Sequence, residues 1–209
     1  MKKFKYSEIT PEKIYKNRRS FIKSIGLGAS SLAISTIPFA NKSFANDRDK
    51  LTSYKDITTY NNYYEFGTSK SDPYRNSQIF KTTPWEISIE GEVEKPIKLS
   101  MEEISEMFVS EERIYRLRCV EGWSMVIPWM GFSLSELLSK VNPTNKAKFV
   151  EFESVYDPAQ MKGQRYPVLN WPYNEGLRID EAMHPLTTVV TGLYGKKLPN
   201  QNGAPLRIF

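Results

Sequence analysis

The 209-residue sequence is poor in residues that build disulfides and metal sites, since it contains one cysteine and one histidine. A single cysteine excludes an intramolecular disulfide framework. The same two counts exclude His-rich metal clusters and a zinc site of the Cys/His type. A metal with only one protein ligand would have to take its other donors from a cofactor.

The sequence also lacks a basic patch in its main part. The net charge is +5, but residues 1–45 contain nine Lys and Arg residues against two Glu residues. The remaining residues are mildly acidic, with 20 basic and 22 acidic side chains. This balance leaves no stripe of positive charge, so we exclude nucleic-acid binding. With 40% hydrophobic and 25% charged residues, the composition is that of a globular protein.

Residues 1–45 are predicted to be an export signal. Arg18 and Arg19 are followed by Phe21, Ile22 and Lys23 and then by a weakly apolar run. This pattern resembles a twin-arginine signal and ends at a small-x-small cleavage site, Ser43-Phe44-Ala45. The alternative is the basic start of an ordinary secretory signal. A membrane span is disfavoured because the run is shorter than the roughly 20 apolar residues that a bilayer requires.

Twin-arginine export carries folded proteins, commonly because a cofactor is inserted beforehand. We therefore predict a cofactor protein located in the periplasm and delivered by the twin-arginine export machinery. Residues 46–209 form its body, which begins with a polar linker over 46–58.

The body is predicted to be α+β with more strand than helix. Short helices are expected to open at Ser100 and at Ser133, each with the Ser-x-x-Glu spacing of a capping box. The final residues, 203–209, form an apolar strand-like run without a polar tail, so we expect the gene product to be truncated at its C-terminus. Strands are expected over residues 85–93, 113–120, 149–155 and 185–193.

Cys119 is the strongest chemical candidate because Arg116 and Arg118 precede it. Nearby arginines favour the thiolate, the form of cysteine that binds metals or attacks electrophiles. The competing interpretation is a buried and inert cysteine. A thiolate with no second protein ligand nearby suits a soft, sulfur-ligated centre that a cofactor completes.

Four other residues allow two interpretations each. His184 precedes a buried strand and is either a structural histidine or, less favoured, a catalytic one. Glu121 either supports the loop after Cys119 or donates a proton. Trp123 and Trp129 either line a substrate entrance or pack in the core, and packing is the more common role of tryptophan.

Five segments together resemble one known family in the same order along the chain. That family is the periplasmic protein-methionine-sulfoxide reductase catalytic subunit, a molybdenum enzyme with a sulfite-oxidase-type fold. The resemblance extends from about residue 54 to the end, and the leader agrees with it. The segments are residues 60–67, 114–125, 128–132, 175–186 and 198–207.

The resemblance implies one Mo-molybdopterin per chain, with Cys119 as the single protein ligand of molybdenum. The dithiolene sulfurs of the pterin and oxygen ligands would complete the metal. Ser154 stands where the family usually has threonine, and it keeps the hydroxyl. An arginine in the pocket suits the pterin phosphate. The implied pterin contacts are Asn61, Tyr64, Glu65, Ser154, Asn202 and Arg207, besides Cys119.

The same resemblance implies a reaction and its partners. Methionine sulfoxide residues of oxidised periplasmic proteins would be reduced by oxygen-atom transfer, with electrons from quinones through a membrane haem b subunit. The family continues beyond Phe209 with further strands and a Gly-Ile-Lys pterin contact, so residues 46–209 are expected to be a truncated molybdopterin-binding domain. Two alternatives stay open. One is a sulfite-oxidase-like enzyme acting on another small S- or N-oxide or oxoanion. The other is an exported binding domain or an inactive truncated remnant.

Overall fold

The computed structural model describes residues 50–119 and 121–209, which fall within one compact unit, Ala45–Phe209. The predicted export signal, residues 1–45, lies outside the described residues. Across the described ranges, no helix has the length and apolar character needed to cross a membrane.

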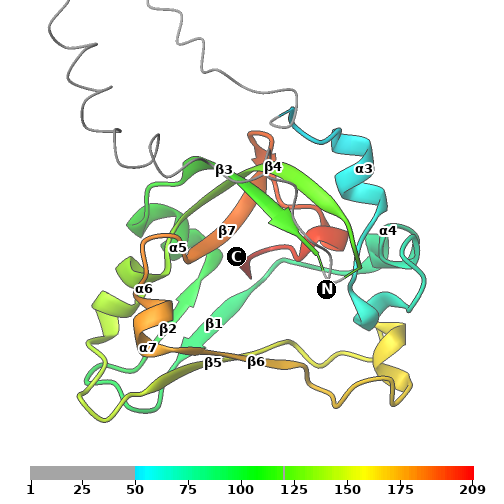
Figure 1. Ribbon diagram of the computed structural model, residues 1–209. Helices are drawn as coiled ribbons and strands as arrows, with labels where there is room; N and C mark the ends of the chain where they lie inside the picture. Colours follow the sequence, from blue (N-terminus) through cyan, green and yellow to red (C-terminus); the bar gives the residue numbers. More distant parts are fainter. Residues whose placement is uncertain (1–49, 120) are drawn as a thin grey trace, which may run out of the picture. The chain divides into compact units, whose positions relative to one another are not determined.

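The described residues contain more strand than helix, which confirms the predicted α+β class (Figure 1). The helices are α3 (Tyr54–Thr59), α4 (Asp72–Asn76), α5 (Met101–Met107), α6 (Leu134–Val141) and α7 (Ile179–Ala182), with 3-10 turns η3 (Tyr64–Phe66), η4 (Ser77–Ile79), η5 (Lys162–Arg165) and η6 (Asn200–Asn202). The strands are β1 (Glu86–Ile89), β2 (Ile97–Ser100), β3 (Glu111–Arg118), β4 (Ser124–Ser133), β5 (Phe149–Glu153), β6 (Asn174–Arg178), β7 (Thr188–Leu193), β8 (Lys196–Lys197) and β9 (Arg207–Ile208).

The strands form three antiparallel groups. The largest has the order β3-β4-β7-β8, and β9 adds to β7 through the pairs Val189–Ile208 and Val190–Arg207. The other two are the pairs β1–β2 and β5–β6. In Figure 1 the β5–β6 pair forms a long ribbon on the opposite side of the molecule from β3 and β4.

Two apolar cores hold the large sheet in place. One lies under α5 and α6, where the rings of Phe108 and Phe132 stack with centroids 4.3 Å apart. The other joins Ile57 of α3 to Trp129 of β4 and to β7. Burial of such side chains contributes on the order of 2 kcal/mol each. The second core therefore fixes α3, and the segment after it, against the sheet.

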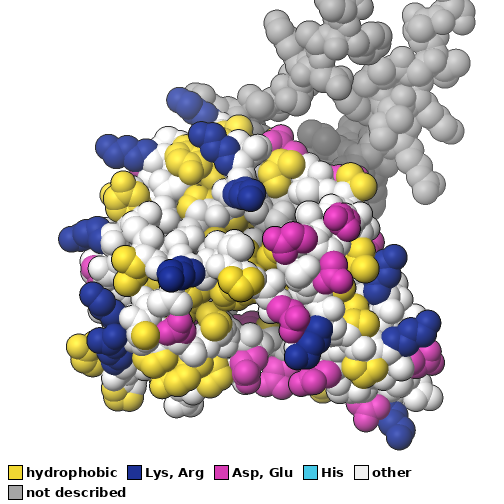
Figure 2. All heavy atoms as spheres, turned by 180° about the vertical axis from the view of Figure 1, so that it is seen from behind, with side chains coloured by type: hydrophobic (Ala, Val, Ile, Leu, Met, Phe, Trp, Pro, Cys, Tyr) yellow, Lys and Arg dark blue, Asp and Glu magenta, His cyan; other side chains and the backbone are white. Residues whose placement is uncertain are grey.

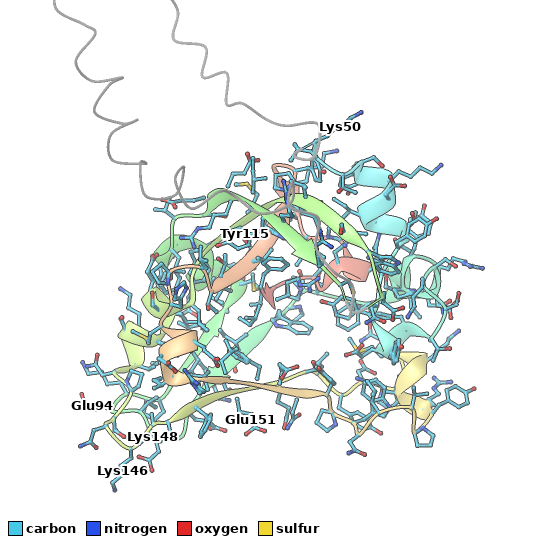
Figure 3. The ribbon with its side chains drawn as sticks, viewed as in Figure 1. Lys50, Glu94, Tyr115, Lys146, Lys148 and Glu151 are labelled. Atoms are coloured by element: carbon cyan, nitrogen blue, oxygen red, sulfur yellow. The ribbon has the colours of Figure 1, made fainter. Side chains whose placement is uncertain are left out.

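Charged side chains are unevenly distributed over the described part of the molecule. On the face seen in Figure 2, acidic side chains gather near the middle and lower part, while most lysines and arginines lie toward the edges. Figure 3 places Tyr115 on β3 and Glu151 on the β5–β6 ribbon, at opposite sides of the interior. Glu94, Lys146 and Lys148 lie at one end of that ribbon (Figure 3).

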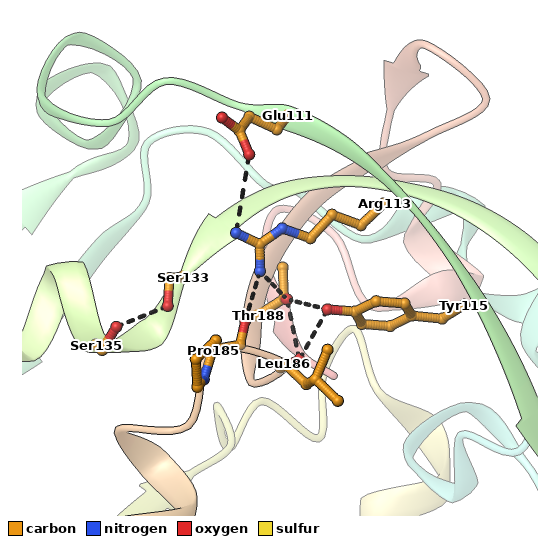
Figure 4. Close-up of polar contacts among 8 residues, drawn as sticks. All are labelled: Glu111, Arg113, Tyr115, Ser133, Ser135, Pro185, Leu186 and Thr188. Carbon is orange, nitrogen blue, oxygen red and sulfur yellow. Dashed lines mark hydrogen bonds and ion pairs between the residues drawn. The ribbon is translucent and has the colours of Figure 1, made fainter. Parts of the chain in front are cut away.

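A polar cluster ties the turn before β7 to β3 (Figure 4). Arg113 donates from Nη1 to the Pro185 carbonyl (2.9 Å) and to Thr188 Oγ1 (3.1 Å). The hydroxyl of Tyr115 donates to the Leu186 carbonyl at 2.9 Å. Thr188 is fully buried, so these bonds satisfy a hydroxyl that would otherwise cost about 1–3 kcal/mol. The cluster fixes the start of β7, the central partner of β4 and β9.

Several element predictions are confirmed and others are wrong in part. Ser100 forms the predicted capping box, accepting from the N–H of Glu103 at 3.2 Å and donating its own N–H to the Glu103 carboxylate at 2.8 Å. Ser133 precedes α6 as predicted but does not cap it. Its hydroxyl pairs instead with that of Ser135, and the N–H of Leu134 donates to the Thr187 carbonyl.

The predicted linker over residues 46–58 is wrong beyond Ser53. The helix α3 starts at Tyr54, and the Ser53 hydroxyl caps it by accepting from the N–H of Asp56. The strands expected over 85–93 and 185–193 are shorter than predicted, since Gly91 turns with φ +95° and residues 185–187 form the turn before Thr188.

Candidate functional site

A single cavity brings all the predicted site residues together. Its volume is about 1860 Å³, larger than the roughly 300–1,000 Å³ of ordinary small-molecule pockets. The sheet, the turns around η3 and η6 and the β5–β6 ribbon supply its walls. The predicted residues among its lining are Asn61, Tyr64, Glu65, Cys119, Ser154, Asn202 and Arg207.

Two asparagines meet at one wall of this cavity. Asn61 follows α3 and Asn202 ends η6, and both side-chain amides donate to the carbonyl of Ile57, each at 3.0 Å. This shared anchor fixes the orientation of both amides, whose oxygens are buried and unpartnered. Buried acceptors without a partner are costly. The pair is therefore arranged to accept hydrogen bonds from a bound group.

Arg207 lies next to the asparagines, where β9 begins. Its Nη1 donates to the Asn202 carbonyl at 3.1 Å, and its guanidinium lies over the rings of Tyr63 and Trp129 at 5.5 and 5.4 Å. Burial raises the pKa of Tyr63, against the opposing effect of the Arg207 charge. The buried Nε of Arg207 has no partner. A cation with a free donor in a cavity suits an anionic group such as phosphate.

Glu65 is a buried carboxyl group in the same wall, on η3. Burial raises its pKa above the ordinary 4.5, while a hydrogen bond from its own backbone N–H acts in the opposite direction. Gly163 of η5 packs against the backbone of Tyr64 and Glu65 so closely that a Cβ there would overlap the Tyr64 carbonyl oxygen. The position of η3 therefore depends on a glycine distant in sequence.

Cys119 lies in the loop that joins β3 to β4. Its N–H donates to the Trp123 carbonyl at 2.9 Å, and its carbonyl accepts from the N–H of Gly122. Gly122 has φ +83°, a conformation that favours glycine. The thiol is half-buried and belongs to the cavity lining. The interpretation as an inert core cysteine is thereby disfavoured, because Cys119 is only partly buried and lines a cavity.

Ser154 enters the cavity from the opposite wall. It follows β5, and its N–H donates to the Tyr173 carbonyl at 2.9 Å. The β5–β6 ribbon thus carries one of the predicted contacts, and the large sheet and the η turns carry the others. Chemically, the lining offers a thiol, two amide oxygens, a carboxyl group, hydroxyls and a guanidinium. In the described residues there is no cluster of three or more His, Cys, Asp or Glu side chains that could hold a metal alone.

The structure distinguishes between the two interpretations that the sequence left open for His184, Glu121, Trp123 and Trp129. His184 is exposed, and its Nδ1 accepts from the N–H of Leu186, which favours the structural role. Glu121 pairs with Lys70 at 2.6 Å, as expected of a loop support. Trp129 is 2% exposed and packs in a core, although it also belongs to the cavity lining. Trp123 lines the cavity and meets the ring of Tyr60 edge-on at 5.9 Å.

Replacing Glu65 by glutamine is expected to stabilise the cofactor-free protein at neutral pH. Burial raises the pKa of Glu65 in the folded state, so below pH about 4.5 the stability contribution of the protonated carboxyl is fully present. As the pH rises through the folded-state pKa, ionisation favours the unfolded state, and the free energy of unfolding falls. The variant should thus have the higher free energy of unfolding at pH about 7, with the gap closing near pH 4. Urea titrations at both pH values measure this.

Glu175 gives the matched control because its pKa shift has the opposite sign. The Tyr173 hydroxyl donates to its carboxylate at 2.8 Å and lowers its pKa. Its contribution to stability is present above the ordinary pKa and is lost as the pH falls, so Glu175→Gln should be the less stable form at neutral pH. Equal effects of Glu65→Gln at both pH values would contradict the assigned cause.

Two residues beside the site were missed by the sequence analysis. Tyr63 lies beneath the Arg207 guanidinium, and Lys70 contacts the Cys119 loop. No motif marks Lys70. Tyr63 belongs to the segment 60–67, but only the tertiary fold brings it to Arg207.

The chain is similar to known molybdopterin-binding proteins. Residues 74–209 match the family described as the oxidoreductase molybdopterin binding domain. Among curated proteins, a protein-methionine-sulfoxide reductase catalytic subunit from Xanthomonas axonopodis pv. citri is 51% identical over 97% of this chain and 67% of its own length. One from Burkholderia mallei is 49% identical over 97% of this chain and 66% of its own length. The chain spans about two thirds of these relatives.

These matches show that the chain belongs to the protein-methionine-sulfoxide reductase catalytic subunit family of molybdopterin-binding oxidoreductases. Among solved structures, the sulfane dehydrogenase SoxCD from Paracoccus pantotrophus aligns with a TM-score of 0.48 and 15% identity. That alignment covers 87% of this chain and 51% of the other.

The residues present fit a molybdopterin-type group. The unpartnered amide oxygens of Asn61 and Asn202 can accept from ring and amino N–H groups of a pterin. The free Nε of Arg207 can donate to a phosphate oxygen. The same cavity is lined by a half-buried thiol, a donor that soft metals prefer.

Proposed function

We propose that this chain reduces methionine sulfoxide residues of proteins with one bound Mo-molybdopterin. The observation that carries the proposal is the single cavity that collects the thiol, the two anchored amides and the guanidinium. Family membership supports it, because the relatives are named for this reaction. Methionine sulfoxide is a polar, oxidised form of an apolar side chain, so its reduction restores packing.

Cys119 would bind molybdenum, and the pterin contacts would be Asn61, Tyr64, Glu65, Ser154, Asn202 and Arg207. When bound, the group supplies two-electron oxygen-atom transfer. The overall reaction takes a sulfoxide, two electrons and two protons to a thioether and water. The protein contributes binding, orientation and electrostatics.

The side chains of this chain have separate tasks in that reaction. The Ile57 carbonyl holds Asn61 and Asn202 in one orientation, so both can position the pterin without rearranging. Arg207, which donates to the Asn202 carbonyl, would bind the phosphate of the pterin. Glu65 is the buried carboxyl of the site, and its raised pKa favours the protonated form, which can donate a hydrogen bond. Trp123, in the Cys119 loop, meets the ring of Tyr60 edge-on and so ties this loop to the segment after α3.

We further propose that the protein acts in the periplasm after twin-arginine export and receives electrons from quinones through a membrane haem b subunit. The paired arginines at positions 18 and 19 support the export route. One cysteine and one histidine in the chain cannot hold an iron–sulfur cluster of four cysteines besides binding molybdenum. In this proposal a partner supplies the electrons.

Substrate profiling of the full chain tests the proposed reaction. With a reduced dye as electron donor, we expect reduction of protein-bound methionine sulfoxide, and with an oxidised dye we expect no comparable oxidation of sulfite. Sulfite oxidation without sulfoxide reduction would instead support a sulfite-oxidase-like enzyme. A cofactor-loaded chain that acts on neither substrate, nor on other small S- or N-oxides, would point to an inactive remnant.

A further inference from the structure

Lys70 contacts two separate parts of the candidate site without lining the cavity itself. It lies in the turn before α4, and its Nζ donates to the Glu121 carboxylate at 2.6 Å and to Asn62 Oδ1 at 3.1 Å. The ammonium also lies over the ring of Tyr64, 5.1 Å from its centroid. Lys70 and Glu121 are 51 residues apart in sequence, so one side chain joins the segment around Tyr64 to a distant loop.

The two segments joined by Lys70 carry the thiol and the pterin contacts. Glu121 is two residues after Cys119, in the same loop. Asn62 and Tyr64 belong to the segment 61–65, whose first residue also donates its backbone N–H to the Lys70 carbonyl at 3.0 Å. The buried, unpartnered amide oxygen of Asn61 is an independent sign that this segment awaits a ligand.

We propose that Lys70 is a positioning residue that holds the Cys119 loop in register with the segment 61–65, so that one cofactor can reach both. The proposal rests on the proposed function only in naming that cofactor. It assigns Lys70 no contact with substrate or metal. Residues that orient the ligands of a metal typically contribute tenfold to hundredfold to its affinity or to activity.

The chemistry of the contacts explains why lysine suits this place. Its ammonium has three donors, and here it meets a carboxylate, an amide oxygen and an aromatic face. The hydrogen bond to Glu121 raises the pKa of Lys70, so the residue stays charged at neutral pH. The side chains of Lys70 and Glu121 are 32% and 25% exposed. The pair is therefore partly screened by solvent, and its effect should shrink as salt increases.

The first test measures how fast the loaded full chain loses its pterin. Lys70→Met keeps most of the aliphatic stem and removes the charge and the donors. We expect it to release the pterin about tenfold faster than the wild type does. The fluorescence of the freed pterin measures this rate. Lys70→Arg should restore most of the retention. The control is Lys98→Met, which breaks the exposed ion pair of Lys98 with Glu86 and should leave retention unchanged.

The second test needs neither cofactor nor activity, so it separates failure of this proposal from failure of the proposed function. Cys119 is the only thiol of the chain, and alkylation of the cofactor-free full chain reports on the loop directly. At one fixed pH, Lys70→Met should raise the alkylation rate several-fold, because a loosened loop makes the thiol more accessible to the reagent. An unchanged or slower reaction would argue against a role of Lys70 in holding the loop.

Glu121→Gln keeps the proposal testable if Lys70→Met fails to fold, which circular dichroism detects. It should reproduce the faster alkylation, and the double variant should add little, because both single changes break one contact. Unchanged alkylation and unchanged pterin release in either folded variant would overturn the proposal. Faster alkylation in a chain that binds no pterin would uphold the role of Lys70 and reject the proposed function.

Discussion

Replacing Cys119 by serine is expected to lower sulfoxide reduction by at least about a thousandfold, equivalent to roughly 4 kcal/mol in activation free energy. A serine hydroxyl is a harder and much less acidic donor than a thiol, so it cannot replace the soft thiolate that a sulfur-ligated metal prefers. The change removes little volume from a half-buried position in a loop. Stability should therefore be almost unaffected.

The control for this variant is Ser124→Ala, an exposed position on the same hairpin that pairs with Arg118 in the strand register. It should keep full activity. Initial rates with an oxidised protein substrate, normalised to folded protein, give the comparison. A Cys119→Ser protein with wild-type rates would show that the thiol is not needed for the reaction.

The second large effect is expected from Gly163→Ala. A Cβ at this position would overlap the carbonyl oxygen of Tyr64 and press on Glu65, so η5 and η3 must move apart. Overpacking of this kind costs about 1–3 kcal/mol. The turn cannot shift freely, because Gln164 is hydrogen-bonded to the backbone of Val155 and Asp157. We expect loss of about 3 kcal/mol in the free energy of unfolding, together with loss of the cofactor.

Gly176→Ala is the matched control, since an added Cβ on β6 would meet only the Val150 carbonyl at 4.0 Å. Its stability should stay within about 0.5 kcal/mol of wild type, as is usual for surface changes. Chemical denaturation and pterin content measure both effects. If Gly163→Ala matched the control in both, the close packing of η5 on η3 would not be what shapes this wall.

The sequence predicted an element correctly where its start depends only on neighbouring residues. Ser100 and Glu103 form their capping box because both partners lie within one turn. The same spacing at Ser133 failed because that residue is the last of β4 and its neighbour Leu134 finds the carbonyl of Thr187. A tertiary hydrogen bond replaced the cap, and no local pattern could reveal it.

The longest strand, β4, has no usable local signal. Its residues are buried on both faces through much of its length, so the period-two alternation disappears. Pro128 and Gly131 also argue against a central strand. Pro128 sits just beyond the end of the β7 register, and a register shift occurs between Met130 and Gly131. Pro128 and Gly131 fit a strand only because of their places in the folded sheet.

The candidate site was predicted residue by residue through resemblance, and the structure places those residues around one cavity. What the sequence could not provide is how they are held. The shared Ile57 carbonyl, the rings under Arg207 and the contacts of Lys70 join residues up to 145 positions apart. Such contacts depend on the packing of α3, β4 and β9, which no spacing along the chain encodes. The assigned roles stay predictions until cofactor binding is measured.

The most direct test of the central claim is the molybdenum and pterin content of the full chain, produced in a host that makes molybdopterin. Elemental mass spectrometry should find close to one molybdenum atom per wild-type chain, and pterin analysis should find an equal amount of pterin. Cys119→Ser should retain far less metal. A folded wild-type chain that carries neither molybdenum nor pterin would contradict the claim that this cavity is a molybdopterin site.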